Sequence, residues 1–214
     1  MLVNSEGRFI SFEGGEGVGK STQVRILVEH LANKGINCIQ TREPGGSSGA
    51  ELIRDLLVKG GTDKWSPISE ALLHNAARAE HLQSTILPAL KQGQWVISDR
   101  YIDSTLAYQG YGQGVELETL LKLHKISTDD FWPHLTIILN GHELGRAKAR
   151  EDENSDKEDR YERMGEDFHS KLQYSFLEIA KNYPDRCIVV SAEGSIDQVA
   201  ARILDIVREK FKLK

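Results

Sequence analysis

The chain has 214 residues, of which 39% are hydrophobic and 28% are charged, and its formal net charge is -5. This length suits one domain with a substantial core, so we treat 1–214 as a single domain. The mildly acidic balance does not favour a nucleic-acid polymer as a partner. No stretch reaches the roughly 20 apolar residues of a membrane span, and residues 1–6 lack the pattern of a signal peptide. We therefore expect a cytoplasmic protein that binds no membrane.

Short apolar runs alternate with longer helical patterns along the chain. The first run, 9–12, precedes a glycine-rich turn and a helical pattern that ends near Gly35. Later strand candidates are 38–41, 95–98, 135–139 and 187–190, and the clearest later helical stretches are 68–87 and 196–211. Strands that are apolar throughout and separated by helices indicate a parallel sheet covered on both faces. The sequence therefore predicts an α/β fold.

A glycine-rich motif follows the first strand candidate. Residues 14–21, GGEGVGKS, match G-x-x-x-x-G-K-[ST] in full and open a helix, as this motif requires. Glycines let successive backbone N–H groups turn toward an anion, and the helix N-terminus adds a positive end. Lys20 can reach the β- and γ-phosphates, and the Ser21 hydroxyl can ligate Mg²⁺. The motif predicts binding of ATP and Mg²⁺ by Gly14, Gly15, Glu16, Gly17, Val18, Gly19, Lys20, Ser21 and Thr22.

This P-loop alone does not name a reaction, because switches, motors, pumps and small-molecule kinases all contain one. A GTPase would need an N-K-x-D type of signature after a later strand. The third and fourth strand candidates instead lead into Asp99-Arg100-Tyr101 and Asn140-Gly141-His142. The charged run 151–160 lacks apolar periodicity and is typical of a solvated loop, which is also what a lid needs. Small size, a lid-like loop and scattered arginines favour a kinase of small molecules.

Two arginines follow predicted strands at the edge where parallel sheets bind ligands. Arg42 begins the turn REPGG after the second strand, and Arg100 follows the third. Together they could hold a phosphate group that is not transferred, since arginine binds phosphate through two parallel hydrogen bonds. Each alone has a simpler explanation, which is a salt bridge to a nearby carboxylate.

Four segments in this order resemble the thymidylate kinase family: the P-loop, REPGG at 42–46, AAR at 76–78 and DRYIDSTLAYQG at 99–110. DRYE at 159–162 is also similar to the stretch after that family's lid, so the resemblance runs from about residue 9 to residue 180. It implies a P-loop NTPase fold with a five-stranded parallel sheet flanked by helices, and a short lid at 146–160. It also implies a homodimer that transfers phosphate from Mg-ATP to dTMP in dTTP biosynthesis.

The resemblance further implies roles for individual acceptor-side residues. Arg42 and Arg100 would hold the dTMP phosphate, and Arg78 would donate a hydrogen bond to thymine O4. Glu16 would approach the deoxyribose 3'-hydroxyl. Tyr108 would pack beneath the sugar, where a 2'-hydroxyl would otherwise sit.

The base would lie beside Ser104 and Thr105. His74 occupies the position where the family usually stacks a phenylalanine on thymine. Histidine can also stack, more weakly and with a charge that depends on pH. The other interpretation of His74 is a polar residue of the helix, with the base held differently.

For catalysis, the resemblance implies that the lid supplies an arginine. Gly17 stands at a P-loop position that is basic in one branch of the family, which indicates the other branch. Arg150 is the first candidate for the lid arginine and Arg160 the second, while Lys20 and Arg100 complete the catalytic set. Asp99 resembles the acidic Walker B residue and would support Mg²⁺ through water. The turn 140–142 and the long acidic run 151–159 depart from the family pattern, so the lid is harder to align than the acceptor site.

Other functions stay open at this level. The chain could be another nucleoside monophosphate kinase or a deoxynucleoside kinase, because one methyl group distinguishes dTMP from dUMP by only about 1–3 kcal/mol. It could also be a P-loop switch or an ATP-binding interaction protein with little turnover, or a catalytically weakened family member.

Overall fold

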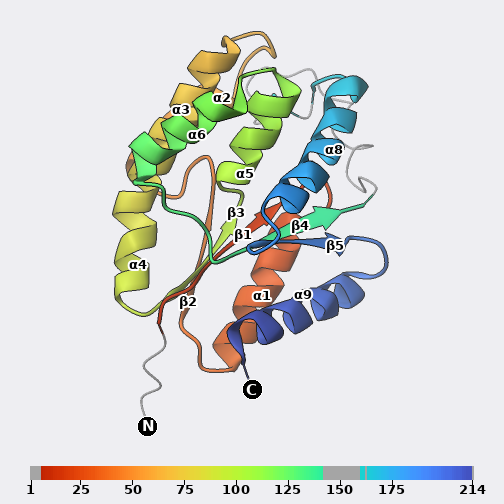
Figure 1. Cartoon of the computed structure of the whole chain (residues 1–214). Helices are drawn as coiled ribbons and strands as arrows, with labels where there is room; N and C mark the ends of the chain where they lie inside the picture. Colours follow the sequence, from red (N-terminus) through yellow and green to blue (C-terminus); the bar gives the residue numbers. More distant parts are fainter. Residues whose placement is uncertain (1–5, 142–159, 162, 214) are drawn as a thin grey trace.

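The computed structural model describes residues 6–141, 160–161 and 163–213. They contain a five-stranded, all-parallel sheet in the order β2-β3-β1-β4-β5 (Figure 1). The strands are β1 (Phe9–Glu13), β2 (Cys38–Arg42), β3 (Trp95–Asp99), β4 (Leu135–Asn140) and β5 (Cys187–Ser191). The predicted α/β class and the five predicted strands are confirmed.

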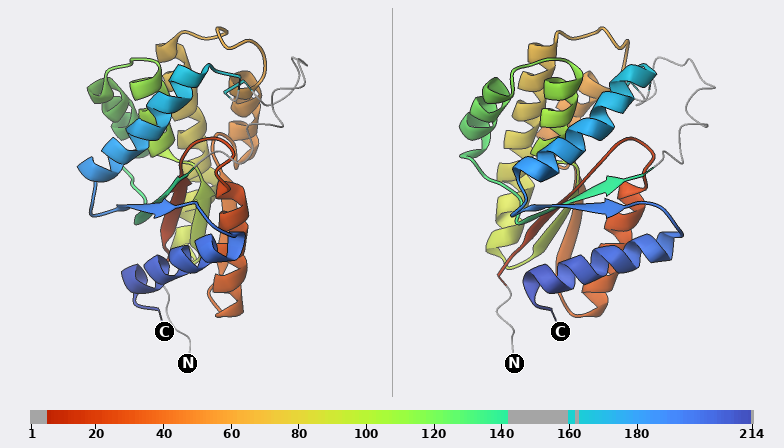
Figure 2. Two further views of the ribbon diagram at one scale, coloured as in Figure 1. Left: turned by 90° about the vertical axis from the view of Figure 1, so that its right-hand side faces the viewer. Right: turned by 45° about the vertical axis from the view of Figure 1, so that its right-hand side comes forward.

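Helices cover both faces of this sheet. Figures 1 and 2 show α1 and α9 side by side on one face, while α3, α4, α5, α6 and α8 lie on the other side. The helices are α1 (Lys20–Asn33), α2 (Ser48–Val58), α3 (Pro67–His81), α4 (Leu87–Lys91), α5 (Ile102–Thr105), α6 (Leu117–Thr128), α8 (Glu166–Asn182) and α9 (Ile196–Phe211), with π-helical segments η1 (Leu82–Ile86) and η2 (Leu106–Gly112). None of the helices in the described part of the chain combines the length and apolar character that a membrane crossing needs.

Each face of the sheet has its own hydrophobic core. Phe9 and Val96 pack with the helices α3 to α8, whereas Ile10 and Phe12 pack with α1 and α9. Every residue of β1 is buried, because this central strand is covered on both faces. This two-sided burial explains why the strands could be predicted as continuous apolar runs.

The predicted helical stretch 68–87 is one continuous helical rod with a π-helical turn inside it. α3 begins after Ser66, whose hydroxyl accepts the Ser69 N–H, and Pro67 stands at the first helical turn. The backbone passes through η1 without a break and continues as α4 to Lys91. The helix is therefore longer than predicted.

The strand order brings three chain segments together at one edge of the sheet. Arg42 pairs with Asp99 in the register of β2 and β3, and Phe12 pairs with Asp99 in that of β1 and β3. Beyond the strands, the Arg100 N–H donates to the Phe12 carbonyl oxygen and the Glu43 N–H to that of Asp99. The P-loop and both strand-end arginines consequently meet at this edge.

Candidate active site

A cavity of about 430 Å³ opens at the carboxyl ends of β1, β2 and β3. It contains the acceptor-side residues that the sequence predicted and much of the P-loop. Of these, the cavity is lined by Glu16, Gly17, Gly19, Lys20, Ser21, Thr22, Arg42, His74, Arg78, Asp99, Arg100, Ser104, Thr105 and Tyr108. A smaller cavity of about 260 Å³ lies behind the loop, where Gly15, Val18 and Asn140 form part of its wall.

The P-loop connects β1 to the first turn of α1. Gly14 and Gly19 have φ of 130° and 96°, in the left-handed region that favours glycine. A side chain at Gly14 would also collide with the Leu139 carbonyl oxygen. Lys20 is buried, and its Nζ donates to the carbonyl oxygens of Gly14 at 3.1 Å and Gly15 at 2.6 Å. The lysine therefore bends back over its own loop.

Two oxygen-bearing side chains meet beside the P-loop. The Ser21 hydroxyl donates to Asp99 Oδ2 at 2.6 Å. A hydroxyl and a carboxylate are hard oxygen ligands of the kind that Mg²⁺ prefers, so this pair fits the ion. Among the described residues there is no cluster of three histidine, cysteine, aspartate or glutamate side chains that would hold a metal without help from a substrate.

Arg100 lies at the centre of the acceptor side. Its φ of 74° is unusual for a residue with a side chain and turns it back toward the P-loop. Its Nη1 donates to the Gly14 carbonyl oxygen at 3.2 Å and to Ser104 Oγ at 3.0 Å. Its Nη2 donates to Glu16 Oε1 at 2.7 Å and to the Tyr108 hydroxyl at 3.0 Å. The Arg100 guanidinium thus joins three other residues predicted for the substrate site, Glu16, Ser104 and Tyr108, to the P-loop residue Gly14.

The charges in this cluster are fixed by their neighbours. Burial alone would raise the pKa of Glu16, but Arg100, Lys20 and a hydrogen bond from Tyr108 outweigh it and lower that pKa to about 2. Burial opposes the charge of Arg100, but Glu16 and the other nearby anions raise its pKa above the ordinary value. Glu16 and Arg100 are accordingly an ion pair at neutral pH.

Glu13, which sequence reasoning missed, supports this arrangement from below. Its side chain is fully buried and accepts the Tyr101 N–H at 2.7 Å and the Ser104 hydroxyl at 2.6 Å. Burial, together with the nearby Asp103 carboxylate, raises the pKa of Glu13 to about 8. Glu13 thereby holds the turn that follows Arg100. An acidic residue ending an apolar strand was the available signal.

Arg42 makes the salt bridge that was its simpler explanation. Its Nη2 lies 3.1 Å from Glu51 Oε2, and both side chains are about half exposed. The other oxygen of that carboxylate accepts the Gly46 N–H at 2.9 Å. Arg42 nevertheless lines the cavity, so both proposed phosphate arginines lie at the ends of neighbouring strands and line the same cavity.

His74 is the residue that departs from the expected aromatic. Its Nε2 is hydrogen-bonded to the Tyr161 hydroxyl at 2.8 Å, and the Tyr161 ring packs edge-on against Tyr108 with centroids 5.5 Å apart. Burial, together with Arg78, Arg160 and Arg100, lowers the pKa of His74 to about 3. A neutral imidazole therefore lines this part of the cavity.

Of the two candidate lid arginines, Arg160 belongs to the described residues. Arg150 and the rest of 146–159 lie outside the described residues. Arg160 is fully buried and is not part of the cavity wall. Its three nitrogens donate to the carbonyl oxygens of Leu57 at 3.1 Å, Gly61 at 2.8 Å and Thr62 at 3.0 Å, and it forms an ion pair with Glu70. In this arrangement Arg160 is anchored to the end of α2 and to the loop between α2 and α3.

Comparison with known proteins assigns the family. Residues 12–203 match the family model described as thymidylate kinase. The chain belongs to the thymidylate kinase family. It is 46% identical over 212 residues to the thymidylate kinase of Caulobacter vibrioides, covering 98% of this chain and 100% of that protein. It is 43% identical over 199 residues to that of Rhizorhabdus wittichii, covering 93% and 96% respectively.

The thymidylate kinase family is also recognisable in three dimensions. The crystal structure of thymidylate kinase from Ehrlichia chaffeensis superimposes with a TM-score of 0.77 at 32% identity, covering 94% of this chain and 98% of that one. The resemblance and the P-loop NTPase fold expected from the sequence are therefore confirmed. As a thymidylate kinase homologue, the chain is a nucleotide-binding phosphotransferase.

Proposed function

We propose that this chain transfers the γ-phosphate of ATP to dTMP, giving ADP and dTDP for dTTP biosynthesis. The observation that carries the proposal is the single cavity into which the P-loop, Arg100 and Arg78 all face. In this proposal the P-loop side of the cavity would bind the nucleoside triphosphate, and the side of Arg78 and Arg100 would bind the phosphorylated acceptor. Family membership over nearly the whole chain supports the choice of dTMP.

On the donor side, residues 14–22 would hold the phosphates of ATP. Lys20 would leave the carbonyl oxygens of its own loop to contact the β- and γ-phosphates. Ser21 would hold Mg²⁺ directly and Asp99 through water. When bound there, Mg²⁺ would supply positive charge that neutralises the negative charge developing on the phosphate groups. Phosphoryl transfer depends mainly on such positioning and charge neutralisation, for which this loop is suited.

On the acceptor side, Arg42 and Arg100 would hold the dTMP phosphate. Glu16 would accept a hydrogen bond from the deoxyribose 3'-hydroxyl, and Tyr108 would lie beneath the sugar. Arg78 would donate to thymine O4. The base would lie against the neutral ring of His74, beside the residues Ser104 and Thr105.

For the lid, residues 146–160, we propose that Arg150 supplies the catalytic arginine in preference to Arg160. Closure of a lid excludes water, which would otherwise accept the phosphate. We further propose a cytoplasmic homodimer. Exposed apolar side chains on α2 and α3 support a covered surface there, namely Leu52, Leu56, Ile68 and Leu72.

The deciding experiment measures ADP release from Mg-ATP with dTMP, dUMP, dCMP, UMP and thymidine as acceptors. We expect strong stimulation by dTMP alone, and its loss in Lys20→Met. The exposed Arg25→Ala serves as the control, because Arg25 forms a surface ion pair with Glu29 on α1 and does not line the cavity. Stimulation by another acceptor would favour a different nucleotide kinase. Absence of stimulation by all five would favour a switch protein or a weakened relative.

A further inference from the structure

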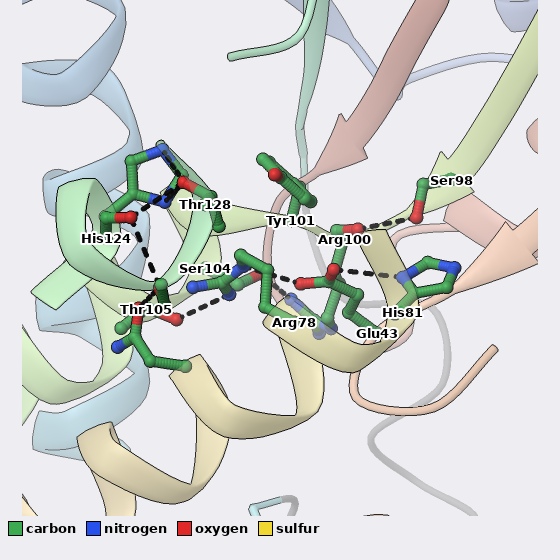
Figure 3. Close-up of polar contacts among 12 residues, drawn as sticks. Glu43, Arg78, His81, Ser98, Arg100, Tyr101, Ser104, Thr105, His124 and Thr128 are labelled. Atoms are coloured by element: carbon green, nitrogen blue, oxygen red, sulfur yellow. Dashed lines mark hydrogen bonds and ion pairs between the residues drawn. The ribbon is translucent and has the colours of Figure 1, made fainter. Parts of the chain in front are cut away.

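Three neighbouring residues, Glu43, Thr105 and Tyr101, hold the guanidinium of Arg78 (Figure 3). Its Nε donates to Glu43 Oε2 and its Nη2 to Thr105 Oγ1, both at 2.8 Å. The guanidinium carbon lies 5.1 Å from the centre of the Tyr101 ring. The side chain is only 1% exposed, and its Nη1 is buried without a hydrogen-bond partner among the described residues.

This remaining nitrogen belongs to a residue that lines the large cavity. A buried donor without a partner is costly, so a site that keeps one is prepared for an acceptor from elsewhere. An arginine donates hydrogen bonds and accepts none. Arg78 can therefore satisfy Nη1 only with a group that presents an oxygen or another acceptor.

The Glu43 carboxylate that holds Arg78 is itself fixed by a second residue. Glu43 Oε1 lies 3.1 Å from His81 Nδ1, and the His81 ring is fully buried. Because an ionised carboxylate only accepts hydrogen bonds, Nδ1 of His81 is the donor. His81 Nε2 is in turn 2.6 Å from Thr41 Oγ1, at the end of β2.

The His81 ring packs closely against Gly46. Gly46 has a φ of 86°, and a side chain there would collide with both His81 Nε2 and Thr41 Oγ1. The backbone of Glu43 is tied to the Asp99 carbonyl oxygen at 2.9 Å. A chain of hydrogen bonds therefore runs from β2 through two buried side chains to the guanidinium of Arg78.

We propose that Glu43 and His81 are positioning residues that aim Nη1 of Arg78 at the pyrimidine 4-position and so set base selectivity. This inference rests on the proposed function. Thymine and uracil present an acceptor oxygen at C4, whereas cytosine presents an amino donor there. A guanidinium fixed in one orientation donates a hydrogen bond to the C4 oxygen but cannot pair with an amino group there. A guanidinium that is free to turn discriminates less between the two bases.

The test compares dTMP with dCMP in steady-state kinetics of the full-length protein. In His81→Phe and Glu43→Ala we expect the KM for dTMP to rise about tenfold, because the hydrogen bond of Nη1 loses its alignment. The ratio of kcat/KM for dTMP to that for dCMP should fall by a similar factor, while the KM for ATP stays unchanged. His81→Asn and Glu43→Gln keep groups that can bridge the same atoms, so they should retain most of the selectivity.

His134→Phe is the matched control. His134 is a half-buried histidine whose Nδ1 accepts the Phe9 N–H at the opposite end of β1, and it does not line the cavity. It should leave the dTMP to dCMP ratio unchanged. That ratio does not depend on the fraction of active enzyme, so partial misfolding alone cannot mimic the expected result.

Stabilisation by dTMP in thermal unfolding gives a readout without turnover, and it should be smaller in His81→Phe than in the wild type. An unchanged ratio and an unchanged dTMP KM in folded His81→Phe and Glu43→Ala would overturn the positioning role and leave the proposed function intact. A wild type that neither phosphorylates nor is stabilised by dTMP would overturn both.

Discussion

Arg78 and Arg160 are both almost completely buried, but they differ in how far the fold satisfies their hydrogen-bonding groups. Each forms an ion pair with a buried glutamate, Glu43 for the first and Glu70 for the second. The three nitrogens of Arg160 are all bound by backbone carbonyl oxygens. Arg78 keeps Nη1 without a partner in the described part of the chain. Hydrogen-bonding capacity that the fold leaves unused marks the arginine meant for a ligand, and saturation marks an anchor.

The largest expected effect separates Arg160 from the other lid candidate. Arg150→Ala should lower kcat by about 10³-fold, by analogy with an arginine finger, with little change in either KM. Its melting temperature should stay close to that of the wild type. A single-turnover measurement of ADP formation checks this. If Arg160→Ala reproduces the kcat loss at normal stability and Arg150→Ala does not, the proposed lid assignment is reversed.

Arg160→Ala should instead act on folding. Removing it leaves the Glu70 carboxylate buried and unpaired, so the free energy of unfolding should fall by roughly 3 kcal/mol. Urea unfolding measures this loss. In Arg25→Ala the same measurement should change by about 0.5 kcal/mol or less, since its ion pair is 58% exposed. A free energy of unfolding equal to that of the wild type in Arg160→Ala would contradict the anchoring role of Arg160.

The role of Arg78 should be measurable as a change in how strongly dTMP stabilises the protein. Arg78→Ala should weaken dTMP binding about a hundredfold, because it removes a charged hydrogen-bond donor from the base. Titration of the melting temperature with dTMP then shows almost no shift, whereas Arg160→Ala should keep the shift at a lower starting temperature. Equal dTMP-induced shifts of the melting temperature in Arg78→Ala and Arg160→Ala would contradict the distinction between a ligand-binding arginine and an anchor.

The smallest effect concerns His74, whose pKa both arginines help to lower to about 3. Below about pH 6.5, the ordinary pKa of histidine, His74 is protonated in the unfolded chain. In the folded chain it stays neutral until the pH approaches 3. Stability therefore falls as pH drops from about 6.5 toward 3, by at most about 2 kcal/mol at pH 5. Urea midpoints at about pH 7.5 and pH 5 should differ less in His74→Phe than in the wild type. Identical differences would rule out this titration.

The fold was largely predictable because its physics is local. Parallel strands buried on both faces are apolar throughout, and α9 repeats Val199, Ile203 and Val207 at helical spacing on its buried side. The π-helical segments η1 and η2 were not predicted, since the same residues would also suit an α-helix. They depend on what the helix packs against.

The site was predictable only in part. The P-loop is contiguous, Arg42 and Arg100 were found from their positions after predicted strands, and Arg78 was found through resemblance to a family. The support beneath them joins residues far apart in the chain: Glu43 meets His81 across 38 residues, and Glu13 meets Ser104 across 91. No periodicity encodes such pairs. Likewise, nothing in the charged run told Arg160 from Arg150, because burial of Arg160 is decided by the loop between α2 and α3.

Helix α3 carries His74, Arg78 and His81, and their spacing places them on one face of the helix. Ile68 and Leu72 stand on the opposite side and are 43% and 50% exposed. The helix is a stiff rod about 10 Å across. Because the proposed homodimer would cover Ile68 and Leu72, the helix that faces the partner subunit would be the same rigid body that carries His74, Arg78 and His81. A small rotation of α3 would move these three side chains together.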